Sequence, residues 1–174
     1  WLGLSCKALA EKQEQIKQAL RENFYDERTN SYCGGVQGAN AFALDIGLGN
    51  AKMLADMANY YDALGEFDTG IFGTDVVLRT LFEGGYTDVA YRLLTSEKKN
   101  SFGYQRSCGA TTLWEDWDGN NSHNHPMFGA CTGYLFRYIL GIRDEADELV
   151  IMPQIPADAS FKFAKGSLKT KFGF

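Results

Sequence analysis

The stretch "NAKMLADMANYYDALGEFDTGIFGTDVVLRTLFEGG" (Asn50–Gly85) indicates the class of fold, because it carries the pattern of a helical hairpin. Asn50 is a suitable N-cap residue, and apolar residues then recur at helical spacing up to Gly65. After a short loop, a second helix is expected to start at Thr74 or Asp75 and to end at the double glycine. Two helices joined by a short loop predict an antiparallel pair.

Helical patterns of the same kind recur along most of the chain. Further helices are expected at Ser5–Phe24, Gln37–Leu48, Asp88–Glu97 and Pro126–Gly141, and Thr87 is expected to cap the third of them. The helical period disappears between the third and the fourth. Because paired helices stack into arrays or close into toroids, these hairpins are consistent with half of a six-hairpin toroid. An open helical bundle is the plainer alternative.

The pattern changes after the last helix. From Asp147 onward, the segments "ELVIMPQIP", "SFKFAKGSL" and "KTKFGF" alternate apolar and polar residues between proline and glycine breaks, which is typical of strands. We therefore expect a helical domain at residues 1–143 and the start of a β-domain at residues 144–174. A sheet of two or three strands leaves an edge unpaired, so we expect residues 144–174 to be the opening of a β-domain that is cut short.

Composition restricts the partners and the compartment. The formal net charge of −5 disfavours nucleic acid and anionic membranes, since both require clustered Lys and Arg. No apolar run is long enough to span a bilayer and no signal peptide is recognisable, so we expect a soluble chain whose parent is cytoplasmic or periplasmic. The four widely spaced cysteines are expected to be buried free thiols.

One stretch concentrates side chains that bind, stack or transfer protons. The segment "GATTLWEDWDGNNSHNHPMFG" (Gly109–Gly129) contains both histidines and two of the three tryptophans. It follows no helical period, and loops on a helical scaffold often carry binding and catalytic groups. In an extended segment Glu115 and Trp117 share one side, while Trp114 and Asp116 share the other. A carboxylate beside an aromatic ring is typical of a sugar site, where the ring stacks on the pyranose.

Other interpretations of this stretch stay open on the residues alone. The tryptophans can be core residues and Glu115 a hydrogen-bonded loop acid, which composition makes as good an explanation as a sugar site. The two histidines, with Glu115 and Asp118, can ligate zinc or iron, although their spacing matches no strong metal signature. A histidine can also activate Cys131 or Ser122 as a nucleophile, although nothing orients such a pair.

The order of residues in this stretch resembles a known family. The segment "GATTLWEDWDG" followed by "SHNHPMFG" is similar to the catalytic domain of bacterial α-L-rhamnosidases, glycoside hydrolase family 78. The motif of that family runs Gly-Ala-Thr-Thr-x-Trp-Glu-x-Trp and then, after a loop, Asn-His-x-x-Phe-Gly. The segments "TGIFGT" (Thr69–Thr74), "GGYTDVAYRLL" and "IMPQIP" resemble the same family. The resemblance implies a mainly α fold: half of an (α/α)6 toroid followed by the first strands of a C-terminal β-sandwich.

The resemblance also implies roles for particular residues. Glu115 matches the general base of an inverting hydrolase that acts on terminal α-L-rhamnosides, and His125 matches a histidine that contacts the rhamnose. Trp117 and Asn124 belong to the same motifs and are expected to shape the substrate-binding pocket, with Thr69–Thr74 at its rim. The expected substrates are rhamnose-containing glycosides or polysaccharides. This chemistry needs no metal or other cofactor.

One part of the family pattern is missing. The general acid of the family lies in an acidic motif with Arg and Trp in the first half of the toroid, and nothing like it occurs between Trp1 and Gly109. We therefore expect a fragment that is inactive alone and that self-associates through uncovered hairpin faces. The alternatives are another (α/α)6 carbohydrate-active enzyme of different sugar specificity and a non-catalytic sugar-binding module.

Overall fold

The computed structural model describes residues 6–145, 147–171 and 173. The described chain is mainly helical, as expected, and its few strands are short. The helices are α1 (Lys7–Phe24), α2 (Gln37–Asp45), α3 (Ala51–Leu64), α4 (Ile71–Glu83), α5 (Thr87–Thr95), α6 (Phe102–Ser107) and α7 (Cys131–Tyr134), and the strands are β1 (Tyr25–Asp26), β2 (Ser31–Tyr32), β3 (Ile142–Asp144) and β4 (Leu149–Ile151).

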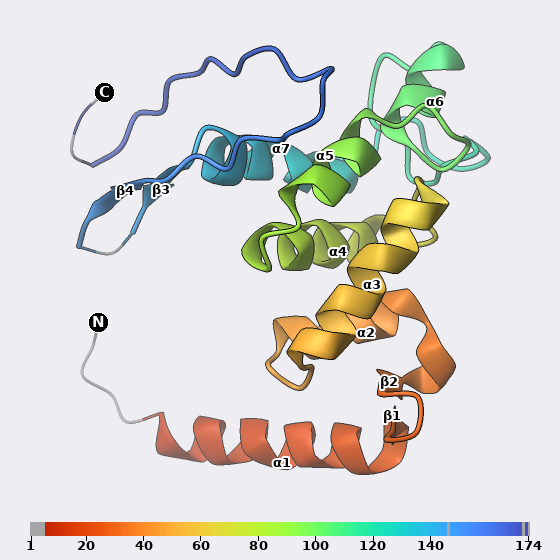
Figure 1. The fold of residues 1–174 in the computed structure, drawn as a ribbon, viewed down its shortest axis with the longest axis vertical. Helices are drawn as coiled ribbons and strands as arrows, with labels where there is room; N and C mark the ends of the chain where they lie inside the picture. Colours follow the sequence, from red (N-terminus) through yellow and green to blue (C-terminus); the bar gives the residue numbers. More distant parts are fainter. Residues whose placement is uncertain (1–5, 146, 172, 174) are drawn as a thin grey trace.

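Helix α4 is the centre of the packing. It contacts α2, α3, α5 and α7, and Figure 1 shows it surrounded by these elements. Seven of its side chains are buried, because its sequence is apolar on more than one face. The main core forms where α4 meets its neighbours and includes Tyr61, Phe67, Leu78, Leu81, Phe82, Leu93, Trp117, Phe128 and Tyr138.

Helix α1 lies at the edge of the molecule, apart from the other helices (Figure 1). Its expected start at Ser5 lies outside the described residues. The helix has no buried residue, and Leu9, Ile16 and Phe24 on its apolar face are 72%, 51% and 51% exposed. Only Leu20 packs partly against a second, smaller core formed by Tyr32, Ala43, Leu48 and Met53. Most of its apolar face is therefore uncovered within the described chain.

The hairpin α3–α4 forms largely as its sequence predicts. The Asn50 side chain accepts a hydrogen bond from the Met53 N–H (2.9 Å), so the predicted N-cap is confirmed. The following turn begins at Gly65, whose φ of +67° is the left-handed conformation that glycine adopts most readily. Helix α4 begins at Ile71 rather than at the predicted Thr74, which lies inside the first turn.

Two local predictions after α4 are wrong. Thr87 does not cap α5, since its hydroxyl donates to the Gln154 Oε1 atom (2.5 Å) of a distant segment. Between α5 and the stretch Gly109–Gly129, where no helix was expected, the structure contains helix α6. Ser101 caps it by accepting a hydrogen bond from the Tyr104 N–H (3.1 Å). Helix α6 is too short for its apolar period to stand out in the sequence.

The last helical segment changes geometry along its length. It begins as a 3-10 helix at Pro126–Ala130, with the proline at its first position as predicted, and continues as α7. A π-helical turn follows at Leu135–Ile139. The segment ends before Gly141, whose φ is +69°. An added Cβ at Gly141 would lie 2.2 Å from the backbone of Met152, so this glycine permits the close approach that starts β3.

The C-terminal part contains fewer strands than the alternating sequence predicts. The segment "ELVIMPQIP" predicts β4, which pairs antiparallel with β3, a strand that was not expected. The segment "SFKFAKGSL" forms no strand and does not extend the β3–β4 sheet. The chain instead returns to the helices: the Ala157 N–H donates to Asp88 Oδ1 (2.6 Å), and Phe161, inside the segment, packs edge-on against Tyr91. The domain boundary at residue 143 stays a prediction, and part of "KTKFGF" lies outside the described residues.

The cysteines differ from expectation in one respect. Cys33, Cys108 and Cys131 are free, but Cys6, Cys33 and Cys108 are exposed, and only Cys131 is half-buried. The prediction of buried thiols is therefore wrong for three of the four cysteines, since each of these three lies at one end of a helical element, where its side chain is exposed. Within the described residues, no helix is long and apolar enough to cross a membrane.

Candidate active-site loop

The loop at residues 110–125 is folded back on itself by hydrogen bonds. The His125 N–H donates to the Leu113 carbonyl (2.9 Å), and the Glu115 N–H donates to the Ser122 carbonyl (2.8 Å). The Thr112 hydroxyl donates to the carbonyl of His123. These bonds pair residues 112–115, before the tip of the loop, with residues 122–125, after it. They bring together residues that are seven to twelve positions apart in the sequence.

Glu115 and His125 face each other across this pairing. The Glu115 Oε2 atom lies 3.8 Å from the His125 Nδ1 atom, and both side chains are partly exposed, at 41% and 28%. The same Oε2 atom accepts a hydrogen bond from the Ser122 N–H (3.3 Å). Within the described residues the other oxygen, Oε1, has no hydrogen-bond partner. Glu115 is thus held at one oxygen and open at the other.

Asp116 lies at the tip of the loop and stabilises the turn there, a role that differs from the one expected of Glu115. Its carboxylate accepts hydrogen bonds from the N–H groups of Gly119 (2.8 Å) and Asn120 (3.1 Å) and from the Asn121 amide. Burial raises the pKa of Asp116, but the hydrogen bonds from Asn121 and Gly119 outweigh this and hold it below its usual value. Asp116 is therefore an ionised turn residue that shapes the loop.

Trp114 and His123 form a stacked pair on the loop. Their ring centroids are 4.5 Å apart with an interplanar angle of 14°, and the His123 Nε2 atom lies 2.8 Å from the Gly119 carbonyl. Trp114 is only 7% exposed. A Cβ added at Gly119 would lie 2.6 Å from the Trp114 ring, and Gly119 has φ of +73°. Trp114, His123 and Gly119 thus support the loop structurally.

Trp117 lies in the hydrophobic core rather than on the surface. It is 8% exposed, and its ring stacks parallel to Phe67 at 5.3 Å and tilted against Phe128 at 4.1 Å. Its indole Nε1–H donates to the Thr69 carbonyl (2.7 Å), in the loop that precedes α4. Trp117 is therefore a core residue and not an exposed sugar platform, and its expected part in shaping the pocket stays a prediction.

Asn124 lies on the exposed surface next to His125. Its backbone N–H donates to Ser122 Oγ (3.2 Å), and its side chain has no hydrogen-bond partner within the described residues. Asn124 and His125 place an amide and an imidazole at the end of the two paired segments of the loop. Both groups can bind hydroxyls.

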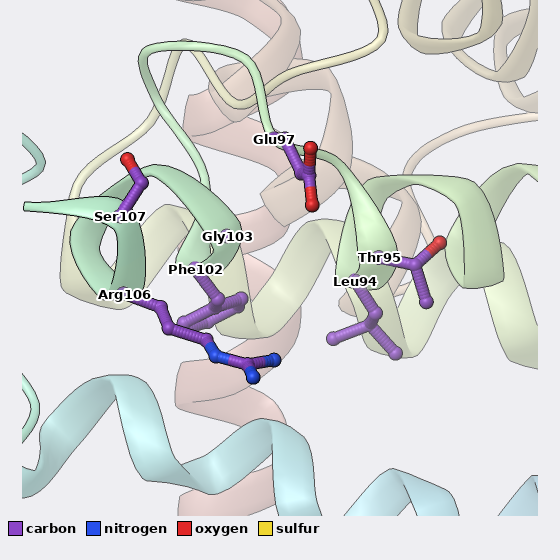
Figure 2. A pocket seen from close by; sticks show the side chains of 7 residues that line it. All are labelled: Leu94, Thr95, Glu97, Phe102, Gly103, Arg106 and Ser107. Atoms are coloured by element: carbon purple, nitrogen blue, oxygen red, sulfur yellow. The ribbon is translucent and has the colours of Figure 1, made fainter.

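A large hollow of the described surface lies outside the 109–129 stretch, no residue of which lines it. Its volume is about 580 Å³, and Figure 2 shows it between the end of α5 and α6. Phe102 connects the two regions, because it lines the hollow and packs edge-on against Trp117 at 5.3 Å. The hollow is lined by Leu94, Thr95, Glu97, Phe102, Gly103, Arg106 and Ser107.

The metal and nucleophile interpretations gain no geometric support. Among the described residues, no three or more His, Cys, Asp or Glu side chains gather as metal ligands would. His123 stacks on Trp114, while His125 faces Glu115. Burial raises the pKa of the Cys131 thiol to about 11, which disfavours the thiolate that a nucleophilic cysteine needs.

A helical scaffold that carries a loop with a half-exposed carboxylate, an imidazole and an amide is characteristic of carbohydrate-active enzymes made of helical hairpins. Residues 5–139 match the family described as the bacterial alpha-L-rhamnosidase 6 hairpin glycosidase domain. Because this match covers more than half of the chain, the chain belongs to that family. The mainly α fold and the resemblance read from the loop are thereby confirmed.

Curated relatives and solved structures agree with this assignment. An alpha-L-rhamnosidase of Alteromonas sp. (strain LOR) is 30% identical over 93% of this chain and 20% of the relative. The structure of the Streptomyces avermitilis alpha-L-rhamnosidase complexed with L-rhamnose matches with a TM-score of 0.79 at 26% identity, over 90% of this chain and 17% of that chain. The alpha-L-rhamnosidase from Dictyoglumus thermophilum matches with a TM-score of 0.69 at 33% identity, over 82% of this chain and 17% of that chain. The chain spans at most about a fifth of the length of these relatives.

The residues that hold Trp117 were missed by sequence reasoning. The segment "TGIFGT" was expected at the rim of the site, and Thr69 does lie beside Trp117. The sequence did not indicate that the contact uses a backbone carbonyl, because every residue type has one. Phe67 is only one of several aromatic residues in its region, so nothing singled it out as the partner of Trp117.

Proposed function

We propose that the chain is part of an inverting glycoside hydrolase that removes terminal α-L-rhamnose from glycosides or polysaccharides. The observation that carries this proposal is the position of Glu115. One of its oxygens accepts the Ser122 N–H and lies near His125, the other has no hydrogen-bond partner within the described residues, and the side chain is 41% exposed. A carboxylate placed in this way can accept a proton from an attacking water, which is the task of a general base.

The proposed mechanism needs a second carboxyl group. Inverting glycosidases place the acid and the base about 6.5–9.5 Å apart, with room for water beside the base. We assign the base to Glu115. Since the chain spans about a fifth of the length of its curated relatives, we assign the general acid to another part of the full-length protein.

The sugar is proposed to lie against the end of the loop that carries His125 and Asn124. The His125 ring lies beside Glu115, and Asn124 is the residue before it, with an exposed amide that has no partner of its own among the described residues. Trp117 is proposed to act beneath the site, through its packing in the core. Its 8% exposure leaves too little ring surface for a sugar to stack on.

The first test removes the proposed base. In the full-length protein, Glu115→Gln should lower kcat on an aryl α-L-rhamnoside by about 10²–10⁴-fold, because the amide cannot accept the proton from water. Asp118→Asn is the matched control, since Asp118 is an exposed acid of the same loop whose carboxylate accepts hydrogen bonds from Asn120, two positions along the chain. A Glu115→Gln protein with nearly wild-type turnover would remove Glu115 from the role of base.

The second test measures the stereochemistry and the sugar. NMR of the first product formed should show β-L-rhamnose if the reaction inverts the anomeric centre. Retention would contradict the assignment of Glu115 as a base. Comparison with other terminal glycosides should show release of rhamnose only, whereas faster release of another sugar would support a related enzyme of different specificity.

The third test concerns this chain alone. The purified 174-residue chain should release no measurable rhamnose from an alkyl α-L-rhamnoside, whose leaving oxygen must be protonated, under conditions in which the full-length protein is active. The reason is that a base without a general acid leaves the departing oxygen unprotonated. Robust turnover by the chain would show that both carboxyl groups lie within it.

A further inference from the structure

We propose that Tyr61 and Asp68 are positioning residues for this reaction: they fix the Phe67–Thr69 segment, which holds Trp117 and thereby places Glu115. This inference rests on the proposed function for its catalytic consequence. The contacts on which it depends belong to three separate elements: helix α3, the loop between α3 and α4, and the loop of the site.

The first step is the attachment of the Phe67–Thr69 segment to α3. The Tyr61 hydroxyl donates to Asp68 Oδ1 (2.6 Å), and the Tyr60 hydroxyl donates to Asp68 Oδ2 (2.8 Å). Asp68 is exposed, yet both of its oxygens are bound, and the Tyr61 side chain is fully buried. Burial, followed by the bond to Asp68, raises the pKa of Tyr61, so its hydroxyl stays a donor.

The second step is the pair of contacts that hold the Trp117 ring in place. The residues on either side of Asp68 both contact the indole: Phe67 stacks parallel to it at 5.3 Å, and the Thr69 carbonyl accepts its Nε1–H at 2.7 Å. One contact restricts the plane of the ring and the other restricts its rotation within that plane. A shift of Asp68 would therefore move both contacts together.

The third step is the tight packing of Thr69. A Cβ added at Gly73 would lie 2.8 Å from the Thr69 Cβ, and one added at Gly38 would lie 3.2 Å from the Thr69 methyl group. The Thr69 hydroxyl also lies 3.0 Å from the Thr74 hydroxyl. A glycine inside a helix is less stable than an alanine there, and at Gly73 the close approach of Thr69 supplies a reason for it.

The last step leads from Trp117 to Glu115. Only one residue separates them, and that residue, Asp116, is fixed by hydrogen bonds from three groups of the loop tip. The backbone of Glu115 is further tied to Ser122. With the segment this short, a displacement of the Trp117 ring reaches the carboxylate. A misplacement of about 1 Å can cost about 10²-fold in rate.

The experiment compares two hydroxyl deletions in the full-length protein. Tyr61→Phe removes the bond to Asp68, and Tyr134→Phe removes an equally short bond, from a nearly buried hydroxyl to Asp75 Oδ1 (2.6 Å), on the α4–α7 contact. Both should lower thermal stability. Only Tyr61→Phe should lower kcat on an aryl rhamnoside, by about 10-fold, with KM changed less than about 2-fold.

Variants of Asp68 test the same path from the other side. Asp68→Ala removes the acceptor of both tyrosines and should lower kcat at least as much as Tyr61→Phe does. Asp68→Asn keeps an acceptor oxygen for Tyr61 and should recover most of the rate. Tyr60→Phe should have the smallest effect, because the Tyr60 ring is 39% exposed and its bond competes with water.

A readout without activity separates this inference from the proposed function. In protein labelled with fluorotryptophan, the ¹⁹F resonance of Trp117 is the one missing from Trp117→Phe. Tyr61→Phe and Asp68→Ala should shift it, and Tyr134→Phe should not. If the full-length protein fails to release rhamnose, the proposed function is wrong. The ¹⁹F resonance still shows whether Tyr61 and Asp68 hold the Trp117 ring in place. An unchanged resonance, or equal losses of kcat in Tyr61→Phe and Tyr134→Phe, would overturn the positioning role.

Discussion

Gly119 shows how a single residue constrains the loop of the site. Its φ of +73° is unfavourable for any residue with a side chain, and an added Cβ would lie 2.6 Å from the Trp114 ring. Gly109 has a similar φ of +86°, but nothing lies within 4 Å of the position of its Cβ. Alanine substitutions at the two positions can therefore separate the free-energy cost of backbone strain from that of a steric clash.

Gly119→Ala should therefore destabilise the protein more than Gly109→Ala. The backbone term, about 1–2 kcal/mol, is common to both, and the displacement of Trp114 adds about 1–3 kcal/mol at Gly119. Urea unfolding of the two variants measures the difference. Equal losses would mean that Trp114 moves without cost, and its stacking with His123 would then contribute little to the loop.

At the residue scale the sequence groups Glu115 with His125 but does not predict the burial of Trp117. The resemblance selects Glu115 and His125, and the structure places them 3.8 Å apart. The resemblance also assigns Trp117 to the site. An irregular loop has no periodicity, however, from which the burial of its side chains could be predicted. The burial of Trp117 depends on Phe67 and Phe128, whose contacts arise only in the folded chain.

Helix α3 is an element whose start can be tested by its cap. Asn50 Oδ1 accepts the Met53 N–H, and the Asn50 amide also donates to Asn30 Oδ1 (2.6 Å) in the β1–β2 turn. Asn50→Ala should lower the free energy of unfolding by about 1 kcal/mol or more, because it removes the cap and the link to the turn. Chemical denaturation measures this change.

Asn50→Asp provides the matched control. The carboxylate keeps the acceptor for the Met53 N–H, and its negative charge is favourable at a helix N-terminus, but it loses the donor to Asn30. It should retain most of the stability that Asn50→Ala loses. If both variants lose the same amount, the link to Asn30 and not the cap determines the stability of this element.

Element predictions succeed where a local signal decides and fail where a distant contact does. The Asn50 cap and the Gly65 stop are local, and the structure has both. Thr87 has the sequence of a cap, but Gln154, 67 positions away, takes its hydroxyl. The alternating segment near Phe161 packs on Tyr91, 70 positions away, instead of extending the β3–β4 sheet.

At the scale of the whole molecule, the distribution of apolar surface leads to a prediction about association. Helix α1 exposes Leu9, Ile16 and Phe24, and an apolar hollow of about 340 Å³ lies beside it, against α2. Phe42 and Ile46 of that region are 45% and 37% exposed. Apolar surface that is this contiguous favours association in water.

We therefore expect the 174-residue chain, when purified alone, to form concentration-dependent oligomers through the α1–α2 region. Sedimentation velocity should show a sedimentation coefficient that rises with concentration. Ile16→Glu should reduce this rise, because a charge on the apolar face must be desolvated in any contact. Gln15→Glu adds the same charge outside that face and should leave association unchanged. A monodisperse, cooperatively unfolding monomer would contradict the prediction, since it would show that the exposed apolar face of α1 needs no covering partner.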